Sequence, residues 1–528
     1  MVTNSRTHTK VGLGARVLDG IERAGNRLPD PFALFIFLFA VIAVVSTVMA
    51  AADVVVELPD AEEPTPIRGF FTGEGITWLT TGMVTNFVEF PPLGVVLTIL
   101  LAVGVAQRTG LLAAVVRRAF GRAPRWALPY VVGIVSVAGN IMSDAAMVAL
   151  PPLAAMVFKA AGRHPVAGLL GSFAAVTAGY SCSPFITSAD ALLSGITTAA
   201  AEPLGDVGTA VTPVSNYFIT ATIAVLLGLV SGLLIDRVLE PSLNRRQMPT
   251  ETVEGVTSTG AKSEDGTDVV LDPELSPQER RGLRWSGLAL MLTVSGVLLL
   301  TLPAGAPMRG EDGGFLPSSP LLDSVVFLVF LTLIVPSITY GLVLRTVTGG
   351  ASIASMMAGA VKDMSGFLVV AFVMAQFLAL FNWSGLSSWL AVTGADLLER
   401  ANFTGFGAIV AFVILAALIN LFVISGSAQW TLFAAVFVPM FALLGYEPGF
   451  IQAAFRIGDS ATNGLSPLNP YMVIILGFLR AYAPNAGLGT VIARALPFSL
   501  VFLVLWIVVL AVFFFTGTPV GPGMGIHL

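Results

Sequence analysis

Three polar side chains interrupt an apolar stretch near the C-terminal end of the chain. Residues 456–467 read RIGDSATNGLSP and lie between the apolar segments GFIQAAF and MVIILGF. A charge at the centre of a bilayer costs about 2.5–3.5 kcal/mol on insertion scales, so it needs a partner or a function there. Arg456 and Asp459 share one face of a helix and can form an ion pair. A guanidinium beside a helix break, near Asn463, can also bind a substrate carboxylate, with Asp459 orienting it.

The composition is that of an integral membrane protein. The 528 residues are 55% hydrophobic and only 11% charged, with a mean hydropathy of +0.86. A soluble globular domain carries about 25% charged residues. Many apolar runs are long enough for helical spans of about 20 residues, and the alternating pattern of a barrel is missing. We therefore expect an all-α polytopic membrane protein.

Several function classes find no support in the residue types. The net charge is −5 without a long basic run, which argues against a nucleic-acid partner. No Cys/His cluster indicates a metal site or a cofactor, and the lone Cys182 excludes an intrachain disulfide. The three histidines, His8, His164 and His527, lie outside the predicted spans. We expect the chain not to be an enzyme, because a nucleophile–base or metal constellation is lacking.

Charged loops set the expected orientation in the membrane. Five basic residues precede the first predicted span, 32–51, and place the N-terminus in the cytoplasm: Arg6, Lys10, Arg16, Arg23 and Arg27. The pattern indicates a retained span rather than a cleaved signal peptide. The loop 52–77 is acidic and should face outward, and a second span, 91–107, returns to a basic loop. We expect a multi-pass protein of the bacterial inner membrane, with the lipid bilayer as its surroundings.

A polar linker at 237–283 divides the chain into two hydrophobic halves, 1–236 and 284–528. Mixed charge and few apolar residues indicate a flexible connection. In the second half we predict six spans, at 285–303, 321–343, 364–382, 405–424, 427–445 and 488–516.

The two halves are related by a shift of 283 positions. The shift lays GRHP (162–165) on GYEP (445–448), and Ser183-Pro184 on Ser466-Pro467. A pair of short helices with a polar turn precedes each motif, GNIMSD in one half and SGS in the other. The first copy is basic and the second carries Glu447, which predicts opposite sides of the membrane. An inverted repeat of this kind is typical of a secondary transporter.

Each repeat continues with an apolar helix, a polar break and a second apolar helix. The breaks read AGYSCSP and TNGLSP. We predict two re-entrant hairpins, at about 165–200 and 448–482, whose tips meet near mid-membrane, where helix ends can bind ions. Pro184, Pro448 and Pro467 would fix their geometry. A re-entrant 165–200 puts the linker outside, whereas six flanking arginines indicate the cytoplasm, so its side stays open.

Other polar residues are candidates for binding or coupling. Asp190, in ITSADALLSG, is a desolvated carboxylate suited to carry a proton, or else a helix N-cap or a vestibule group. Asp144 resembles a helix cap. Asn420, Ser427 and Trp430 cluster opposite the second hairpin, either as substrate contacts or as groups that bond neighbouring backbone.

Three stretches resemble the p-aminobenzoyl-glutamate transporter (AbgT) family: SDAAMVALPPLAAMVFKAAGRHPVAGLLGSFAAVTAGYS, SGSAQWTLFAAVFVPMFALLGYEP and QAAFRIGDSATNGLSPLNPY. The resemblance implies a homodimer with nine transmembrane helices and two hairpins per protomer. It implies transport of p-aminobenzoyl-glutamate or sulfonamide-type antimetabolites, driven by the proton motive force. The family's functional positions match Asp190, Asn420, Ser427, Trp430, Pro448, Arg456, Asp459 and Pro467. The first tip departs from the family pattern, with Ser181-Cys182-Ser183 for Ser-Ala-Asn and Ala191 for a proline.

The expected function is proton-coupled secondary transport of an aromatic, carboxylate-bearing small molecule. Arg456 would bind the anion, and Asp190 or Asp459 would carry the proton. Asn420, Ser427 and Trp430 would line the pocket. A sodium-coupled carboxylate carrier is the alternative, because hydroxyl-rich tips and unwound carbonyls also suit Na⁺. An intramembrane enzyme and a passive channel are remoter alternatives. The direction of transport stays open.

Overall fold

The computed structural model describes residues 29–56, 64–121, 123–205, 210–250, 275–316 and 319–528. The five basic residues before the first span, His8 and the middle of the linker lie outside the described residues. The described chain is helical apart from two short paired strands, β1 (Val55–Val56) and β2 (Thr65–Pro66). The predicted all-α polytopic class is confirmed.

The first half contains two groups of helices. The leading group is α2 (Pro31–Ala51), α3 (Gly73–Val88), α4 (Pro91–Arg108) and α5 (Leu111–Phe120). The first repeat follows, with α6 (Leu128–Ala138), η1 (Gly139–Met142), α7 (Ala145–Ala160), α8 (Pro165–Ala178), α9 (Ser188–Ala201), η2 (Glu202–Leu204), α10 (Tyr217–Leu234), η3 (Ile235–Leu239) and α11 (Glu240–Arg245).

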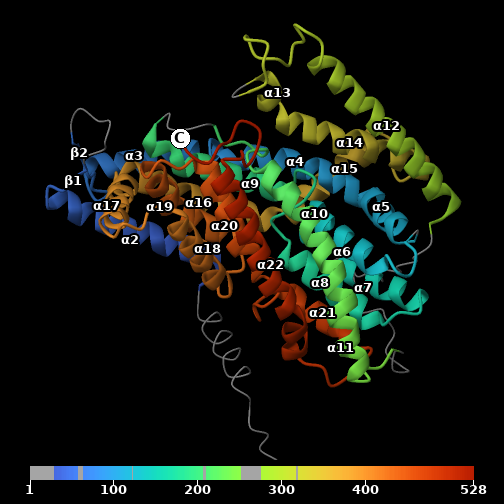
Figure 1. Ribbon diagram of the computed structural model, residues 1–528. Coiled ribbons are helices and arrows are strands. Elements are labelled where there is room, and N and C mark those ends of the chain that lie inside the picture. Colours follow the sequence, from blue (N-terminus) through green and yellow to red (C-terminus); the bar gives the residue numbers. More distant parts are fainter. Residues whose placement is uncertain (1–28, 57–63, 122, 206–209, 251–274, 317–318) are drawn as a thin grey trace, which may run out of the picture.

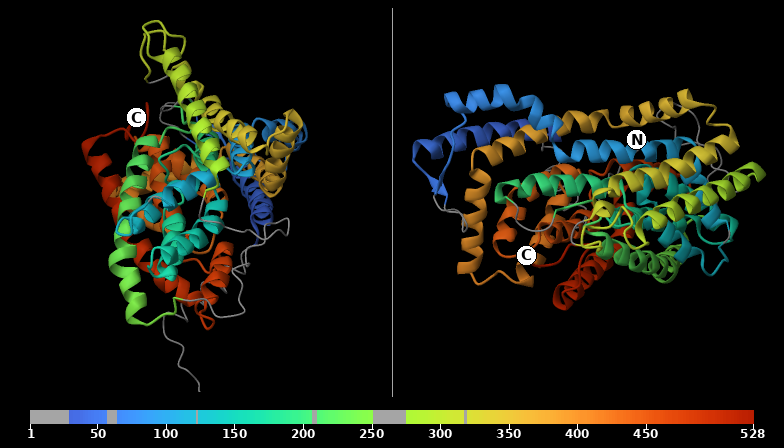
Figure 2. Two further views of the ribbon diagram at one scale, coloured as in Figure 1. Left: turned by 90° about the vertical axis from the view of Figure 1, so that its right-hand side faces the viewer. Right: turned by 90° about the horizontal axis from the view of Figure 1, so that it is seen from above.

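The second half has the same plan. Its leading group is α12 (Pro277–Thr301), α13 (Pro320–Asp323), α14 (Val325–Leu344), α15 (Gly350–Asp363), α16 (Ser365–Trp383) and α17 (Leu386–Arg400). The second repeat is α18 (Phe406–Asn420), α19 (Gly426–Leu443), α20 (Pro448–Ala461), α21 (Pro470–Arg480) and α22 (Leu488–Thr516). Helices α12 and α14 run side by side along one edge of the molecule, and α2, α3 and α17 lie at the opposite edge (Figures 1 and 2).

Two helix pairs are re-entrant hairpins. In the first, α6–α7, the two ends meet: Arg163 Nη1 donates to Arg125 O at 3.0 Å, and Arg125 Nη2 donates to Gly162 O at 3.1 Å. In the second, α18–α19, Tyr446 Oη donates to Thr404 O at 2.7 Å and closes the open end in the same way. Two re-entrant hairpins were predicted, and two are present. They are the helix pairs that contain the GNIMSD and SGS turns, and not the predicted segments 165–200 and 448–482.

The segment 165–201 crosses the protein instead of returning. At its start, Arg163 is hydrogen-bonded to Glu240, the first residue of α11. At its end, Thr198 Oγ1 donates to Val211 O at 3.2 Å, just before α10 begins. Helices α10 and α11 form one rod of 29 residues, about 44 Å long, so the two ends lie on opposite sides. Its assignment as a hairpin is therefore wrong; α8 and α9 are two halves of a broken crossing.

The segment 448–480 crosses in the opposite direction. Helix α20 starts beside the beginning of α10, where Asn216 Nδ2 donates to Gly449 O at 2.7 Å. Helix α21 leads into α22, a helix of 29 residues, whose far end is followed by residues that return to the start of α20. There Glu447 N donates to Ile526 O at 3.0 Å. This segment is also a broken crossing rather than a hairpin. The opposite directions of α8 and α20 confirm the inverted repeat.

The number of membrane crossings agrees with the nine transmembrane helices that the family resemblance implies. Within the described residues, eight helical segments are long and apolar enough to cross a membrane. One of them, α19, is an arm of the second hairpin and does not cross. The two broken helices, α8–α9 and α20–α21, are too short to be recognised by length, and they bring the described crossings to nine.

The arrangement also places the two ends of the linker at the same end of the molecule. Arg163 is bonded to Glu240 at the start of α11, and Arg117 pairs with Glu279 at the start of α12 at 2.5 Å. Both belong to one arginine-rich end of the molecule. We call this the arginine-rich end, defined by Arg117, Arg125 and Arg163. The linker thus begins and ends at the arginine-rich end, and the side of the membrane on which this end lies stays a prediction.

Candidate functional site

Four polar breaks converge on one cavity of about 570 Å³, here called the central cavity. They are the turns of the two re-entrant hairpins and the interruptions of the two broken helices. Helices α4 and α16 complete the wall with Val96, Leu100 and Phe367. The polar groups that line it are Ser143, Asp144, Tyr180, Ser181, Ser188, Asp363, Ser425, Ser427, Asp459, Asn463, Asn469 and Tyr471. The prediction that the breaks of the two repeats meet is confirmed.

Asp459 is a buried carboxylate at the wall of the central cavity. Its Oδ2 accepts from Ser181 Oγ at 2.8 Å, across the contact between the two broken helices. Its Oδ1 has no hydrogen-bond partner within the described part of the chain. A Cβ on Gly426 would lie 2.9 Å from this oxygen, so the glycine of the SGS turn lets the hairpin approach the carboxylate closely. One oxygen of Asp459 is therefore held and the other is available.

Arg456 pairs with Asp190 and not with Asp459. Its Nη1 donates to Asp190 Oδ1 at 2.6 Å and to Ser181 O at 3.1 Å. With the Gln452 amide oriented to satisfy its neighbours, its oxygen accepts from Arg456 Nη2 at 3.1 Å. Arg456 is 1% exposed. The predicted ion pair within α20 is thus replaced by a pair between the two repeats, and Arg456 does not line the central cavity.

Asp190 is also part of a helix N-terminus. Thr187 N and Thr187 Oγ1 both donate to Asp190 Oδ2 at 2.7 Å, and Asp190 N donates back to Thr187 Oγ1 at 3.3 Å. This capping box starts α9. Thr187, not Asp190, is the cap residue. Both carboxylate oxygens of Asp190 are occupied, so it is less suited than Asp459 to take up a proton.

Asn420 and Trp430 lie behind the cavity wall. Trp430 Nε1 donates to Thr197 Oγ1 at 3.0 Å, and its ring packs on Phe455 with the ring centres 4.5 Å apart. Asn420 Nδ2 donates to Asp459 O at 2.5 Å. Both side chains are fully buried and do not line the cavity, in contrast to the predicted pocket. Ser427 and Asn463 do line it.

The three prolines stand at helix starts and breaks. Pro448 is the first residue of α20, and Pro467 lies in the second break. Pro184 lies in the first break, where its carbonyl accepts from Tyr217 Oη at 3.3 Å. A proline at the first helical position loses no helical hydrogen bond, so Pro448 fits its place without strain.

Comparison with known proteins identifies the family. Residues 16–528 match the sequence model described as "AbgT putative transporter family". The chain belongs to the AbgT family. It is 36% identical to the p-aminobenzoyl-glutamate transport protein of Escherichia coli (strain K12) over 504 residues, which cover 96% of each chain. With these relatives, this AbgT-family chain is a membrane transporter and not an enzyme.

Two solved structures share the fold of this AbgT-family chain. The YdaH transporter of Alcanivorax borkumensis superposes with a TM-score of 0.85 at 36% identity, over 94% of this chain and 100% of that one. MtrF of Neisseria gonorrhoeae superposes with a TM-score of 0.85 at 34% identity, over 96% and 100%. MtrF is described as illuminating a class of antimetabolite efflux pumps.

Sequence reasoning missed two acidic residues of the AbgT-family cavity. Asp144 was predicted to cap α7, but its side chain makes no cap bond and instead accepts from Tyr180 Oη at 3.4 Å. The repeat could have indicated that Asp144 lines the cavity, because a shift of 283 lays Asp144 on Ser427, which was a predicted pocket residue. Asp363, at the end of α15, pairs with Arg108 at 2.6 Å. No local pattern marks Asp363, since its place depends on how α15 packs on α4.

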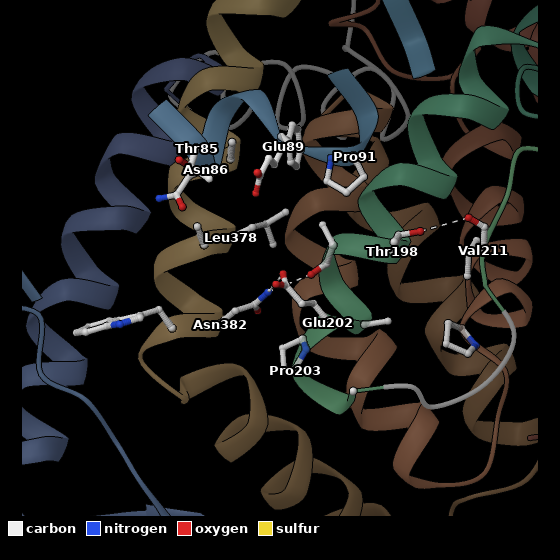
Figure 3. Close-up of a pocket in the computed structure, with 18 of the residues that line it drawn as sticks. Thr85, Asn86, Glu89, Pro91, Thr198, Glu202, Pro203, Val211, Leu378 and Asn382 are labelled. Carbon is white, nitrogen blue, oxygen red and sulfur yellow. Dashed lines mark hydrogen bonds between the residues drawn. The ribbon is translucent and has the colours of Figure 1, made fainter. Parts of the chain in front are cut away.

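A second cavity of about 880 Å³ lies further along the same helices α4, α9 and α16, away from the arginine-rich end (Figure 3). Glu89 and Glu202 line it, and Asn382 Nδ2 donates to Ala199 O at 3.0 Å within it. Between the two cavities α4 and α9 are in close contact. A Cβ on Gly195 would lie 2.6 Å from the nitrogen of Pro92, so the glycine allows this close approach of the two helices.

Proposed function

We propose that this AbgT-family transporter moves p-aminobenzoyl-glutamate or related aromatic carboxylates and sulfonamide-type antimetabolites, coupled to protons. The relatives support the substrate class: one is named for p-aminobenzoyl-glutamate transport and another is described among antimetabolite efflux pumps. We place the protein in the bacterial inner membrane as a homodimer, with its N-terminus and arginine-rich end in the cytoplasm.

The observation that carries the proposal is the central cavity with Asp459 in its wall. Its volume, about 570 Å³, falls within the range of roughly 300–1,000 Å³ that small-molecule sites occupy. It is enclosed by both repeats, which suits a site that alternates between the two sides of a membrane. Cavity-lining carboxylates at this depth are typical of proton relays and ion pathways.

The lining fits an aromatic molecule with acidic groups. The hydroxyls of Ser188 and Ser427 and the amides of Asn463 and Asn469 can donate hydrogen bonds to carboxylate or sulfonyl oxygens. Phe367 and Tyr180 offer aromatic faces to a ring. A cavity that offers hydrogen-bonding groups together with aromatic and apolar surface fixes the orientation of a ligand.

The charges of the lining give a reason for coupling. The described lining contains Asp144, Asp363 and Asp459 but no lysine or arginine. An anionic substrate beside an ionised Asp459 meets like-charge repulsion in a medium of low dielectric. Protonation of Asp459 removes that repulsion, so binding of the substrate and binding of the proton depend on each other. The same linkage serves uptake or export, depending on the gradients.

The test is transport of labelled p-aminobenzoyl-glutamate in vesicles that contain the purified protein. We expect a pH gradient of either sign to drive net flux, with choline in place of Na⁺, and a sulfonamide to compete. Flux that requires Na⁺ at a fixed pH gradient would instead support the sodium-coupled carrier. No flux above that of protein-free vesicles under either gradient would contradict the proposed substrate.

A further inference from the structure

An apolar cavity of about 610 Å³, here called the lateral cavity, lies between the leading groups of helices and the first repeat. Helices α5, α12 and α14 line one side of it (Figure 1). Helix α6, the turn of the first re-entrant hairpin and the first break line the other side. Its described lining shares no residue with the central cavity or with the second cavity. The proposed transport function therefore gives it no ligand.

The lateral cavity offers no free hydrogen-bond donor to a polar ligand. Among its described lining residues, three carry a polar side-chain group: Tyr217, Ser286 and Thr332. Each hydroxyl already donates to a backbone carbonyl of the protein, at distances from 2.9 to 3.3 Å. An apolar cavity of this kind stays dry and binds apolar ligands.

The wall of the lateral cavity reaches the surface of the spanning region, where a membrane protein meets lipid. Phe185, from the first break, is 53% exposed. Ile134 on α6 and Leu290 on α12 are 41% and 40% exposed. A Cβ added to Gly287, also in the α12 wall, would meet nothing within 4 Å. The cavity is thus accessible to a lipid chain from the side.

The lateral cavity has the depth of one leaflet of a bilayer. Its α12 wall runs from Leu283 to Val294, which is about 16 Å at the helical rise per residue. The hydrocarbon core of a bilayer is about 30 Å thick, so one leaflet is about 15 Å deep. Leu283 lies near the start of α12, at the arginine-rich end. One acyl chain that enters from this end fits the cavity in length.

Two exposed arginines stand where the lateral cavity meets the arginine-rich end. Arg280 is three residues before Leu283 and seven before Gly287, so it lies on their face of α12. Arg284 is three residues before Gly287, and neither arginine forms an ion pair within the described residues. Guanidinium groups bind phosphate oxygens through two parallel N–H groups, and basic pockets between membrane helices bind anionic headgroups. Trp285, 49% exposed, is a residue type enriched at headgroup level.

We infer that the lateral cavity binds an acyl chain of one anionic phospholipid, whose phosphate Arg280 and Arg284 hold at the arginine-rich end. The two positive charges select an anionic headgroup over a zwitterionic one. The apolar lining holds the chain. Because the cavity lies between the leading groups and the first repeat, the bound lipid stabilises their arrangement. The inference depends on neither the proposed substrate nor the proposed coupling ion.

The experiment measures thermal unfolding of the purified full chain in detergent, with added phosphatidylglycerol or with phosphatidylcholine of the same acyl chains. We expect phosphatidylglycerol to raise the Tm of the wild type by several degrees more than phosphatidylcholine does. In Gly287→Phe the ring fills the cavity, so this advantage should disappear. Arg280→Gln and Arg284→Gln should each reduce the advantage, and the two together should abolish it.

Two control variants should keep the advantage of phosphatidylglycerol. Gly296→Phe places the same ring on the opposite face of α12, where an added Cβ also meets nothing within 4 Å. Arg400→Gln removes one exposed arginine at the end of α17, at the opposite edge of the molecule. If Gly287→Phe does not fold, Val294→Phe fills the cavity from the same wall and carries the same expectation.

Three results would overturn the inference. The first is a wild-type Tm that rises no more with phosphatidylglycerol than with phosphatidylcholine, because the arginines would then select no headgroup. The second is an undiminished advantage of phosphatidylglycerol in a folded Gly287→Phe or Val294→Phe variant. The third is a change in oligomeric mass, by light scattering, in Gly287→Phe but not in Gly296→Phe. A second copy of the chain, and not a lipid, would then occupy the cavity.

Discussion

At the residue scale, the sequence predicted that Arg456 needs a partner but indicated the wrong one. Asp459 lies three residues away on the same helix, whereas the actual partner, Asp190, is 266 residues away. Asp459 instead turns toward Ser181 and the SGS turn. Local spacing can propose a pair within one helix, but the choice between two carboxylates depends on how the two repeats pack together.

The buried ion pair leads to a prediction about stability. Removing one partner of a buried pair leaves an uncompensated charge and costs about 3–5 kcal/mol, whereas replacing both by apolar residues is often neutral. We therefore expect Asp190→Leu alone to lower the Tm sharply, and Asp190→Leu combined with Arg456→Met to recover most of the loss. Thermal unfolding of the purified variants measures this. A double variant no more stable than the single one would show that the charges are not coupled.

At the element scale, most helices and their breaks could be predicted from the sequence. The sequence did not show which helix pairs are re-entrant and which cross the membrane. Polar turns such as GNIMSD and AGYSCSP look alike, because both expose backbone groups in apolar sequence. The arginines beside the linker favoured a crossing at 165–201, and the structure agrees with them. Helices α3, α5, α15 and α17 were not predicted, since they are short or too polar to resemble spans. The long apolar helix α10 was also not predicted.

Close helix packing on α10 gives a second prediction. Gly228 and Gly232, four residues apart, face α6 of the first hairpin, as small residues do where membrane helices approach closely. A Cβ on Gly232 would lie 2.5 Å from Tyr130 Cα, a backbone atom that cannot move aside. We expect Gly232→Ala to lower stability by about 1–3 kcal/mol. Gly296→Ala is the control, because nothing lies within 4 Å of its added Cβ. Equal Tm values for the two variants would contradict this packing.

At the scale of the whole molecule, the repeat and its inversion were predicted from a few matched residues and the charges beside them. The meeting of the breaks AGYSCSP and TNGLSP was predicted from that symmetry, but the arrival of the GNIMSD turn at the same cavity was not. The shape of the central cavity did not, because α4, α15 and α16 belong to no matched motif. Nor did the sequence place Trp430 and Asn420 behind the wall, since burial of a polar side chain depends on contacts far along the chain.

The crossing at 165–201 predicts a labelling pattern. With Cys182→Ser as background, the chain has no other cysteine. Lys159 and Glu202 are exposed and flank the two ends of the crossing. We expect a membrane-impermeant thiol reagent to label Lys159→Cys from one side of oriented vesicles and Glu202→Cys from the other only. Labelling of both variants from the same side would contradict the crossing and support a re-entrant hairpin at 165–201.

The most direct measurement compares net transport driven by a pH gradient with exchange of labelled for unlabelled substrate, in the same vesicles. Exchange needs the cavity but no net proton movement. For Asp459→Asn we expect exchange to persist while net flux driven by the gradient falls to the level of protein-free vesicles. Full gradient-driven accumulation by Asp459→Asn would contradict the assignment of the coupling proton to Asp459.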